Sequence, residues 1–143
     1  MQKIILDTNV LVSALWSPDK DIARILDEIV FEEKVETCLS MAILAEYEDV
    51  LSREKFAARP NWSERAARIL DTLNAVGTFY KPIEKLSLIK DEPDNRFAEL
   101  ALEANADFLI TGNSRDFTMD RIGQTRIINP KVFYEGFMAG FEE

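Results

Sequence analysis

Four acidic residues are spaced so that they could meet at one edge of a sheet: Asp7, Glu46, Asp94 and Asp116. Asp7 directly follows the apolar residues 4–6, which are typical of a short buried strand. In open parallel sheets, chemical groups collect beyond the carboxyl ends of the strands. A buried carboxylate there needs a cation or hydrogen bonds to offset its desolvation. We therefore expect a carboxylate site, with the capping of a following helix as the alternative role of Asp7.

The acidic set has a common chemical requirement. Several carboxylates that converge repel one another, and this repulsion raises some of their pKa values. A hard divalent cation removes the problem, because Mg2+ takes oxygen ligands and usually keeps water molecules. Such an ion can generate hydroxide and stabilise the leaving oxygen of a phosphodiester. The alternatives are a solvated helix position for Glu46, a helix cap for Asp94 and a turn position for Asp116.

The composition excludes several other chemistries. Histidine is absent, which removes the usual general base, the Ser–His and Cys–His couples and histidine-ligated metals. The only cysteine, Cys38, cannot form an intrachain disulfide, and its apolar surroundings predict a buried structural thiol. The formal net charge of -9 argues against bulk electrostatic coating of nucleic acid, although a local basic patch and a cation would still permit binding.

Length and hydrophobicity predict one folded domain, residues 1–143. A chain of 143 residues with 47% hydrophobic residues can bury a substantial core. No segment approaches the roughly 20 apolar residues that cross a membrane. The N-terminus enters a strand without the anatomy of a signal peptide. We therefore expect a cytoplasmic protein.

Apolar periodicity predicts strands that alternate with helices. The strands are expected at residues 4–6, 35–39, 78–80, 107–111 and 125–128. The residues typical of helix N-termini are Ser17 with Pro18, Ser40, Ser63, Asp94, and Asn129 with Pro130. Gly77 suits the C-terminal exit of the helix after Ser63. This alternation predicts right-handed crossovers and an α/β fold, in which helices cover both faces of a parallel sheet.

Glu46 lies at the border of the apolar face of the helix expected after Ser40. That face consists of Ile43, Leu44, Tyr47, Val50 and Leu51. A carboxylate at the border of a buried face can point along the sheet toward the strand ends. We therefore expect Glu46 to lie near Asp7.

The order and spacing of several motifs resemble the PIN domain family, and within it the VapC-like toxins of toxin–antitoxin pairs. The matching segments are LDTNVLVSA at 6–14, AEY at 45–47 with VL at 50–51, DEPDNRF at 91–97, ADFLITGN at 106–113 with DF at 116–117, and INP at 128–130 with Phe133. They cover nearly the whole chain. Each motif alone is weak, and their order and spacing carry the resemblance.

The resemblance implies a three-layer α/β/α fold with a central parallel sheet of about five strands, and Mg2+- or Mn2+-dependent endoribonuclease activity. It implies that Asp7, Asp94 and Glu46 hold the metal. The catalytic set is completed in the region of Thr111, where Asp116 is our candidate. Supporting roles are expected for Thr8, Asn9, Thr111 and Asn113.

Asn113 departs from the family pattern, because many members carry an acid two residues after the threonine that ends the strand. Either Asp116 takes over this role or Asn113 holds a water molecule. The departure leaves open one metal or two. It also leaves open a second function class, a non-catalytic PIN module that binds RNA or a protein partner.

One basic stretch stands out in this acidic chain. Its cations are the candidates for RNA or partner contacts: Arg53, Lys55, Arg59, Arg65 and Arg68. Trp62, within the stretch, could stack on a base or pack into the core. Family toxins are usually silenced by an antitoxin peptide, whose groove could include Trp16, Trp62 and Phe56. The aromatic residues near the C-terminus are expected to be core or homodimer contacts: Phe133, Tyr134, Phe137 and Phe141.

Overall fold

Five short strands pair in parallel at the centre of the structure. The structure is a computed structural model that describes residues 1–17, 21–83, 92–112 and 120–140. The strands are β1 (Lys3–Leu6), β2 (Glu36–Leu39), β3 (Thr78–Phe79), β4 (Phe108–Ile110), β5 (Arg121–Ile122) and β6 (Thr125–Ile128). The sheet order is β3-β2-β1-β4-β6-β5, and every neighbouring pair is parallel except β5 and β6. All five predicted strands are therefore confirmed.

The sixth strand, β5, was not predicted. It has two residues and forms an antiparallel hairpin with β6, in which Ile122 pairs with Thr125. Gly123 has a φ of 58° in the intervening turn, a conformation that suits glycine in a tight hairpin. Two residues are too few to show the alternation of a strand.

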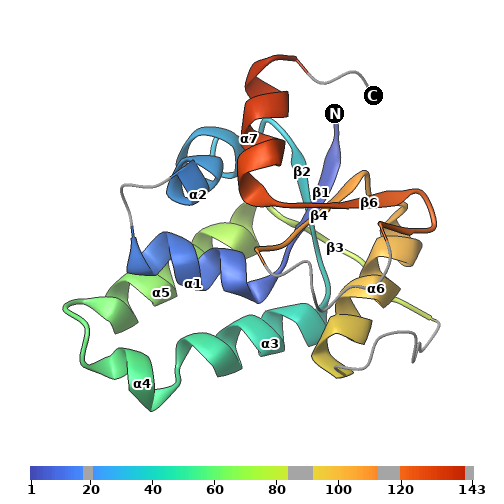
Figure 1. Cartoon of the computed structure of the whole chain (residues 1–143). Helices are drawn as coiled ribbons and strands as arrows, with labels where there is room; N and C mark the ends of the chain where they lie inside the picture. Colours follow the sequence, from blue (N-terminus) through green and yellow to red (C-terminus); the bar gives the residue numbers. More distant parts are fainter. Residues whose placement is uncertain (18–20, 84–91, 113–119, 141–143) are drawn as a thin grey trace.

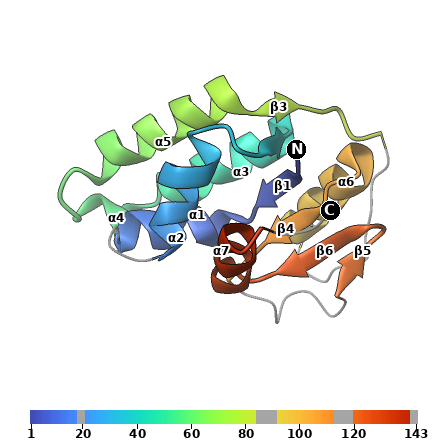
Figure 2. The ribbon, with the colours of Figure 1, turned by 90° about the horizontal axis from the view of Figure 1, so that it is seen from above.

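Helices cover both faces of the sheet (Figure 1). They are α1 (Thr8–Trp16), α2 (Asp21–Arg24), the π-helical η1 (Ile25–Val30), α3 (Met41–Leu51), α4 (Glu54–Ala57), α5 (Trp62–Val76), α6 (Glu92–Ala104) and α7 (Pro130–Met138). Figure 2 shows α6 on one side of the strands and α1, α2 and α5 on the other, with α7 against α2. This arrangement confirms the predicted three-layer fold. Helix α3 runs along the edge where β1 and β2 end, and contacts α1, α5 and α6.

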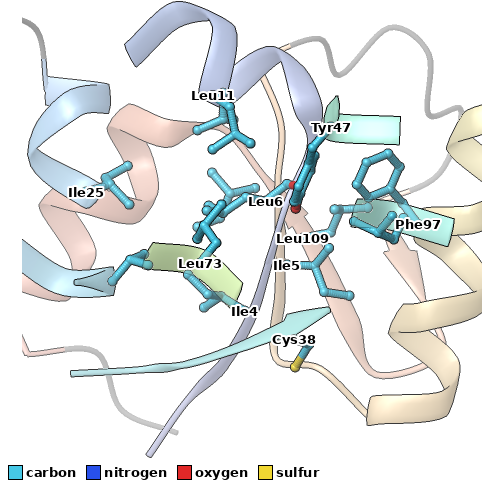
Figure 3. Close-up of a cluster of buried hydrophobic side chains, with 14 of the residues drawn as sticks. Ile4, Ile5, Leu6, Leu11, Ile25, Cys38, Tyr47, Leu73, Phe97 and Leu109 are labelled. Carbon is cyan, nitrogen blue, oxygen red and sulfur yellow. The ribbon is translucent and has the colours of Figure 1, made fainter. Parts of the chain in front are cut away.

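The apolar strand residues form the core between these layers. Ile4, Ile5, Leu6 and Leu109 are wholly buried (Figure 3). Cys38 is also wholly buried, and burial raises the pKa of its thiol to about 12, which confirms a structural thiol.

The closing helix α7 adds aromatic side chains to this core. Phe133 is wholly buried and its ring centroid lies 5.6 Å from that of Phe108. Phe137 packs on Phe133, and the Tyr134 hydroxyl donates to Glu28 Oε1 at 3.1 Å. Phe133 is therefore a core residue, and Tyr134 and Phe137 are partly buried against the core, whereas Phe141 lies outside the described residues.

Local capping explains several helix starts. The Ser40 side chain accepts a hydrogen bond from the Ile43 N–H at 3.2 Å, and Asn129 accepts from Val132 N–H at 2.8 Å, as predicted. The prediction of Ser63 as a cap is wrong, because α5 begins at Trp62 after Asn61, whose φ is 58°.

One further start also differs from prediction. Helix α6 begins at Glu92, so Asp94 lies in its first turn and is not its cap. Pro93 favours this earlier start, because proline suits the first turn of a helix. Pro18 lies outside the described residues, and α2 begins at Asp21.

Gly77 ends α5 as predicted, but its backbone is not left-handed, since φ is -77°. A Cβ atom at Gly77 would collide with the Leu39 side chain and the Leu73 carbonyl oxygen. Close approach of the helix end to β2 therefore explains this glycine. Within the described ranges, none of the helices has the length and apolar character to cross a membrane.

Candidate active site at the carboxyl edge of the sheet

Asp7 lies at the point where β1 becomes α1. Its backbone N–H donates to the Ile110 carbonyl of β4 at 2.9 Å, which extends the strand pairing by one residue. Its side chain is 6% exposed, and Oδ1 accepts a hydrogen bond from the Thr8 N–H at 2.7 Å. Oδ2 accepts from the Thr111 hydroxyl at 2.7 Å. Asp7 therefore caps α1, and it lies at the carboxyl edge of the sheet, where its role as a metal ligand stays a prediction.

Asn9 joins the start of α1 to the end of β4. Its Nδ2 group lies 3.2 Å from Asp7 Oδ2 and 3.3 Å from Thr111 Oγ1, and donates to both. Its Oδ1 atom accepts from the Gly112 N–H at 3.0 Å. The network fixes the orientation of the Asp7 carboxylate through partners that are more than a hundred residues away in sequence.

Glu46 approaches the same edge from α3. Its side chain is half-buried, and the Thr8 hydroxyl lies 3.5 Å from Oε2, at the limit of a hydrogen bond. Burial raises the pKa of Glu46, and the negative charges of Asp49 and Asp7 add to this increase, while Arg53 and the Thr8 hydrogen bond oppose it. The structure thus brings Asp7, Thr8, Asn9, Glu46 and Thr111 together.

This donor set fits a divalent cation. Asp7 and Glu46 supply hard carboxylate oxygens, and burial raises the pKa of Glu46. Hydrogen bonds like those to Asp7 commonly orient the carboxylates that bind metals in proteins. In the described part of the chain, no group of three or more Asp, Glu, Cys or His side chains is placed to hold a metal ion.

Three predicted site residues cannot be placed fully. Asp94 lies on the first turn of α6, but its side chain is outside the described set. Asn113 and Asp116 lie outside the described residues altogether. Their proximity to Asp7 therefore stays a prediction.

Two cations of the basic stretch, Arg59 and Arg65, lie at the opposite end of α1 from Asp7. Arg65 donates to the Leu15 carbonyl at 2.6 Å, and Arg59 donates to the Trp16 carbonyl at 2.9 Å. The Arg59 guanidinium also stacks 3.7 Å from the centre of the Trp16 ring. Because Asp7 caps the other end of this nine-residue helix, about 13 Å of helix separates these contacts from Asp7. The structure therefore does not bring Arg59 and Arg65 into the carboxylate site.

The other three cations of the stretch are exposed. Arg53 forms an ion pair of 3.4 Å with Asp49 on the surface of α3. The Lys55 ammonium lies 5.2 Å from the centre of the Phe56 ring. Arg68 lines a cavity of about 260 Å³ between α1, α2 and α5.

Trp62 is a core residue. It is 2% exposed, its indole N–H donates to the Leu51 carbonyl at 2.9 Å, and its ring stacks on Phe56 at 4.6 Å. The suggestion that Trp62 stacks on a base is therefore wrong. Phe56 is 6% exposed, so of the three predicted groove residues only Trp16, at 46%, is open to a partner.

The sequence profile of the PIN domain matches residues 3–115. The chain belongs to the PIN domain family. A relative of this PIN domain is the uncharacterised protein MJ1680 of Methanocaldococcus jannaschii, which is 33% identical over 111 residues, 78% of this chain and 70% of the relative.

Solved structures share the fold of this PIN domain. VapBC2 from Rickettsia felis, bound to a promoter DNA fragment, matches with a TM-score of 0.60 and 21% identity over 90% of this chain and 98% of the other. PAE2754 from Pyrobaculum aerophilum matches with a TM-score of 0.63 and 14% identity over 96% of this chain and 90% of the other.

One residue at this edge was not singled out from the sequence. Tyr47, next to Glu46, was expected only on the apolar face of its helix. Its hydroxyl donates to the Leu6 carbonyl at 2.6 Å. The available signal was the tyrosine itself, because a buried phenol usually finds a hydrogen-bond partner.

Proposed function

We propose that this PIN domain is a divalent-metal-dependent endoribonuclease. The observation that carries the proposal is the approach of Glu46 to the Asp7 network, at the carboxyl edge of a parallel sheet. Two carboxylates in a chain without histidine suit hydrolysis assisted by a metal better than histidine-based chemistry.

Asp7, Glu46 and Asp94 would hold Mg2+ or Mn2+, with Asp116 as a further candidate. The bound ion would supply an activated water and charge stabilisation for a phosphodiester. The protein's own contribution is orientation. Thr111 and Asn9 hold the Asp7 carboxylate through Oδ2, and the Thr8 N–H holds it through Oδ1.

We infer that the biological role is that of a toxin controlled by an antitoxin protein. The support is membership of the PIN domain family, the fold shared with VapBC2, and the resemblance of the motifs of this chain to VapC-like toxins. RNA is the proposed substrate. A cytoplasmic location and a homodimer are expected for such a toxin.

The activity is tested with purified protein, single-stranded RNA and Mn2+. We expect cleavage that stops with chelator and is abolished by Asp7→Asn and by Glu46→Gln. Asp71→Asn is the matched control, since Asp71 is an exposed acid on α5 and its loss should leave cleavage unchanged. Cleavage that persists in Asp7→Asn would contradict the proposed site. RNA binding without cleavage in the wild-type protein would favour the non-catalytic PIN module.

A further inference from the structure

Tyr47 connects α3 to the end of β1 through the core. Its side chain is wholly buried, and its ring lies 6.3 Å from that of Phe97 of α6. Figure 3 shows the Tyr47 side chain beside Leu6 and Phe97. The hydroxyl donates to the Leu6 carbonyl oxygen at 2.6 Å, so a phenol of α3 satisfies the last carbonyl of β1.

The Leu6 carbonyl needs this partner because of where β1 ends. The pairing of β1 with β2 involves Lys3 and Ile4, whereas Leu6 lies beyond it. On the other side, β4 is paired with β1 as far as Leu6, and the Asp7 N–H donates to Ile110. The peptide between Leu6 and Asp7 is therefore held at its N–H by β4 and at its carbonyl by Tyr47.

This peptide leads into Asp7, and Glu46 directly precedes Tyr47 in α3. One hydrogen bond therefore links the peptide that precedes Asp7 to the side chain of the residue that follows Glu46. We propose that Tyr47 is a positioning residue, which sets the separation of the Asp7 and Glu46 carboxylates through the Leu6 carbonyl. The expected effect on metal binding rests on the proposed function, whereas the hydrogen bond of Tyr47 to the Leu6 carbonyl does not.

The chemistry of tyrosine suits this role. Burial raises the pKa of Tyr47, and the negative charge of Asp7 raises it further, so the hydroxyl stays protonated as a donor. Phenylalanine would fill the same space but would leave the Leu6 carbonyl without this donor. A buried carbonyl that loses its partner is free to rotate or to recruit water, and either change moves Asp7.

Tyr47→Phe tests the proposal, with Thr125→Val as the matched control. Thr125 is also wholly buried, and its hydroxyl donates to the Ala106 carbonyl at 2.7 Å. It begins β6, so it lies at the opposite edge of the sheet from Asp7. Both variants remove one buried hydroxyl donor to a backbone carbonyl, and thermal melting compares their global stability.

Two measurements are made on each variant. The first is amide hydrogen exchange at Asp7 without metal, which we expect to become about 10-fold faster in Tyr47→Phe, as the loss of one hydrogen bond implies. The second is Mn2+ affinity, which we expect to fall by about 10-fold, as is typical for residues that orient metal ligands. Thr125→Val should change neither beyond its effect on global stability.

Exchange at Asp7 that rises equally in both variants would overturn the proposal, because the effect would then be general destabilisation. Faster exchange in Tyr47→Phe with unchanged Mn2+ affinity would overturn the positioning of the carboxylates. A wild-type protein that binds no Mn2+ would instead refute the proposed metal site. The exchange measurement alone would then decide whether Tyr47 holds the Asp7 peptide.

Discussion

The Thr111 hydroxyl donates to Asp7 Oδ2 at 2.7 Å, although the two residues are 104 positions apart in the sequence. Thr111 is wholly buried at the end of β4, and Asp7 follows the neighbouring strand β1. Neighbouring parallel strands end at the same edge of a sheet, so the pairing of β1 with β4 brings these two residues within hydrogen-bond distance. The hydrogen bond fixes which lone pairs of Asp7 are available to a ligand.

Replacing Thr111 with Val should weaken Mn2+ binding by about 10-fold, because Asp7 loses a partner that orients it. Thr111→Ser keeps the hydroxyl and should restore most of the affinity. Isothermal titration with Mn2+ measures both. Equal affinity in Thr111→Val and in the wild-type protein would show that the hydrogen bond does not organise the site.

Glu46 should make the stability of the metal-free protein depend on pH. Its pKa is raised in the folded state, so the folded protein holds the proton more tightly than the unfolded chain. The contribution of Glu46 to folding stability is therefore lost as pH rises from its pKa of 4.5 in the unfolded chain through its raised pKa in the folded protein.

We accordingly expect Glu46→Gln to melt at a slightly higher temperature than the wild-type protein at pH 7 without metal, with the difference vanishing below pH of about 4. Glutamine keeps an acceptor for the Thr8 hydroxyl. Saturating Mn2+ should stabilise the wild-type protein more than the variant. A variant less stable than the wild-type protein at pH 7 without metal would contradict this account.

Arg65 should matter for stability and not for RNA binding. Its guanidinium donates to the Leu15 carbonyl near the C-terminal end of α1, so Arg65→Ala should lower the free energy of unfolding by about 1.5 kcal/mol. Arg53→Ala is the control, because its ion pair with Asp49 is exposed and should contribute less than about 0.5 kcal/mol. Urea denaturation measures both. Equal losses in the two variants would remove the special role of Arg65.

RNA contacts from the basic stretch should come from its exposed members, Arg53, Lys55 and Arg68. Each phosphate contact that is lost should reduce the slope of log affinity against log salt by about 0.7 for single-stranded RNA. Binding measured by fluorescence anisotropy at several salt concentrations gives this slope for each alanine variant. If Arg59→Ala or Arg65→Ala changes the slope while these three do not, the assignment of roles within the stretch is wrong.

The sequence by itself determined the α/β class, five of the strands and the caps at Ser40 and Asn129. These features depend on interactions between near neighbours, namely apolar periodicity and a side chain that bonds to a backbone N–H three residues later. The position of Asp7 directly after an apolar strand could be predicted from the same local patterns. The position of Glu46 at the border of a helix face could be predicted from them too.

Only the tertiary structure decided which distant groups meet. The pairs Thr111 with Asp7, Tyr47 with Leu6 and Arg65 with Leu15 join residues that are far apart in the sequence. Such pairs depend on strand order and on which helix faces pack together, and no local pattern encodes them. For the same reason, the tryptophan of a basic stretch proved to be buried in the core, and two of its arginines proved to bond to the end of a helix.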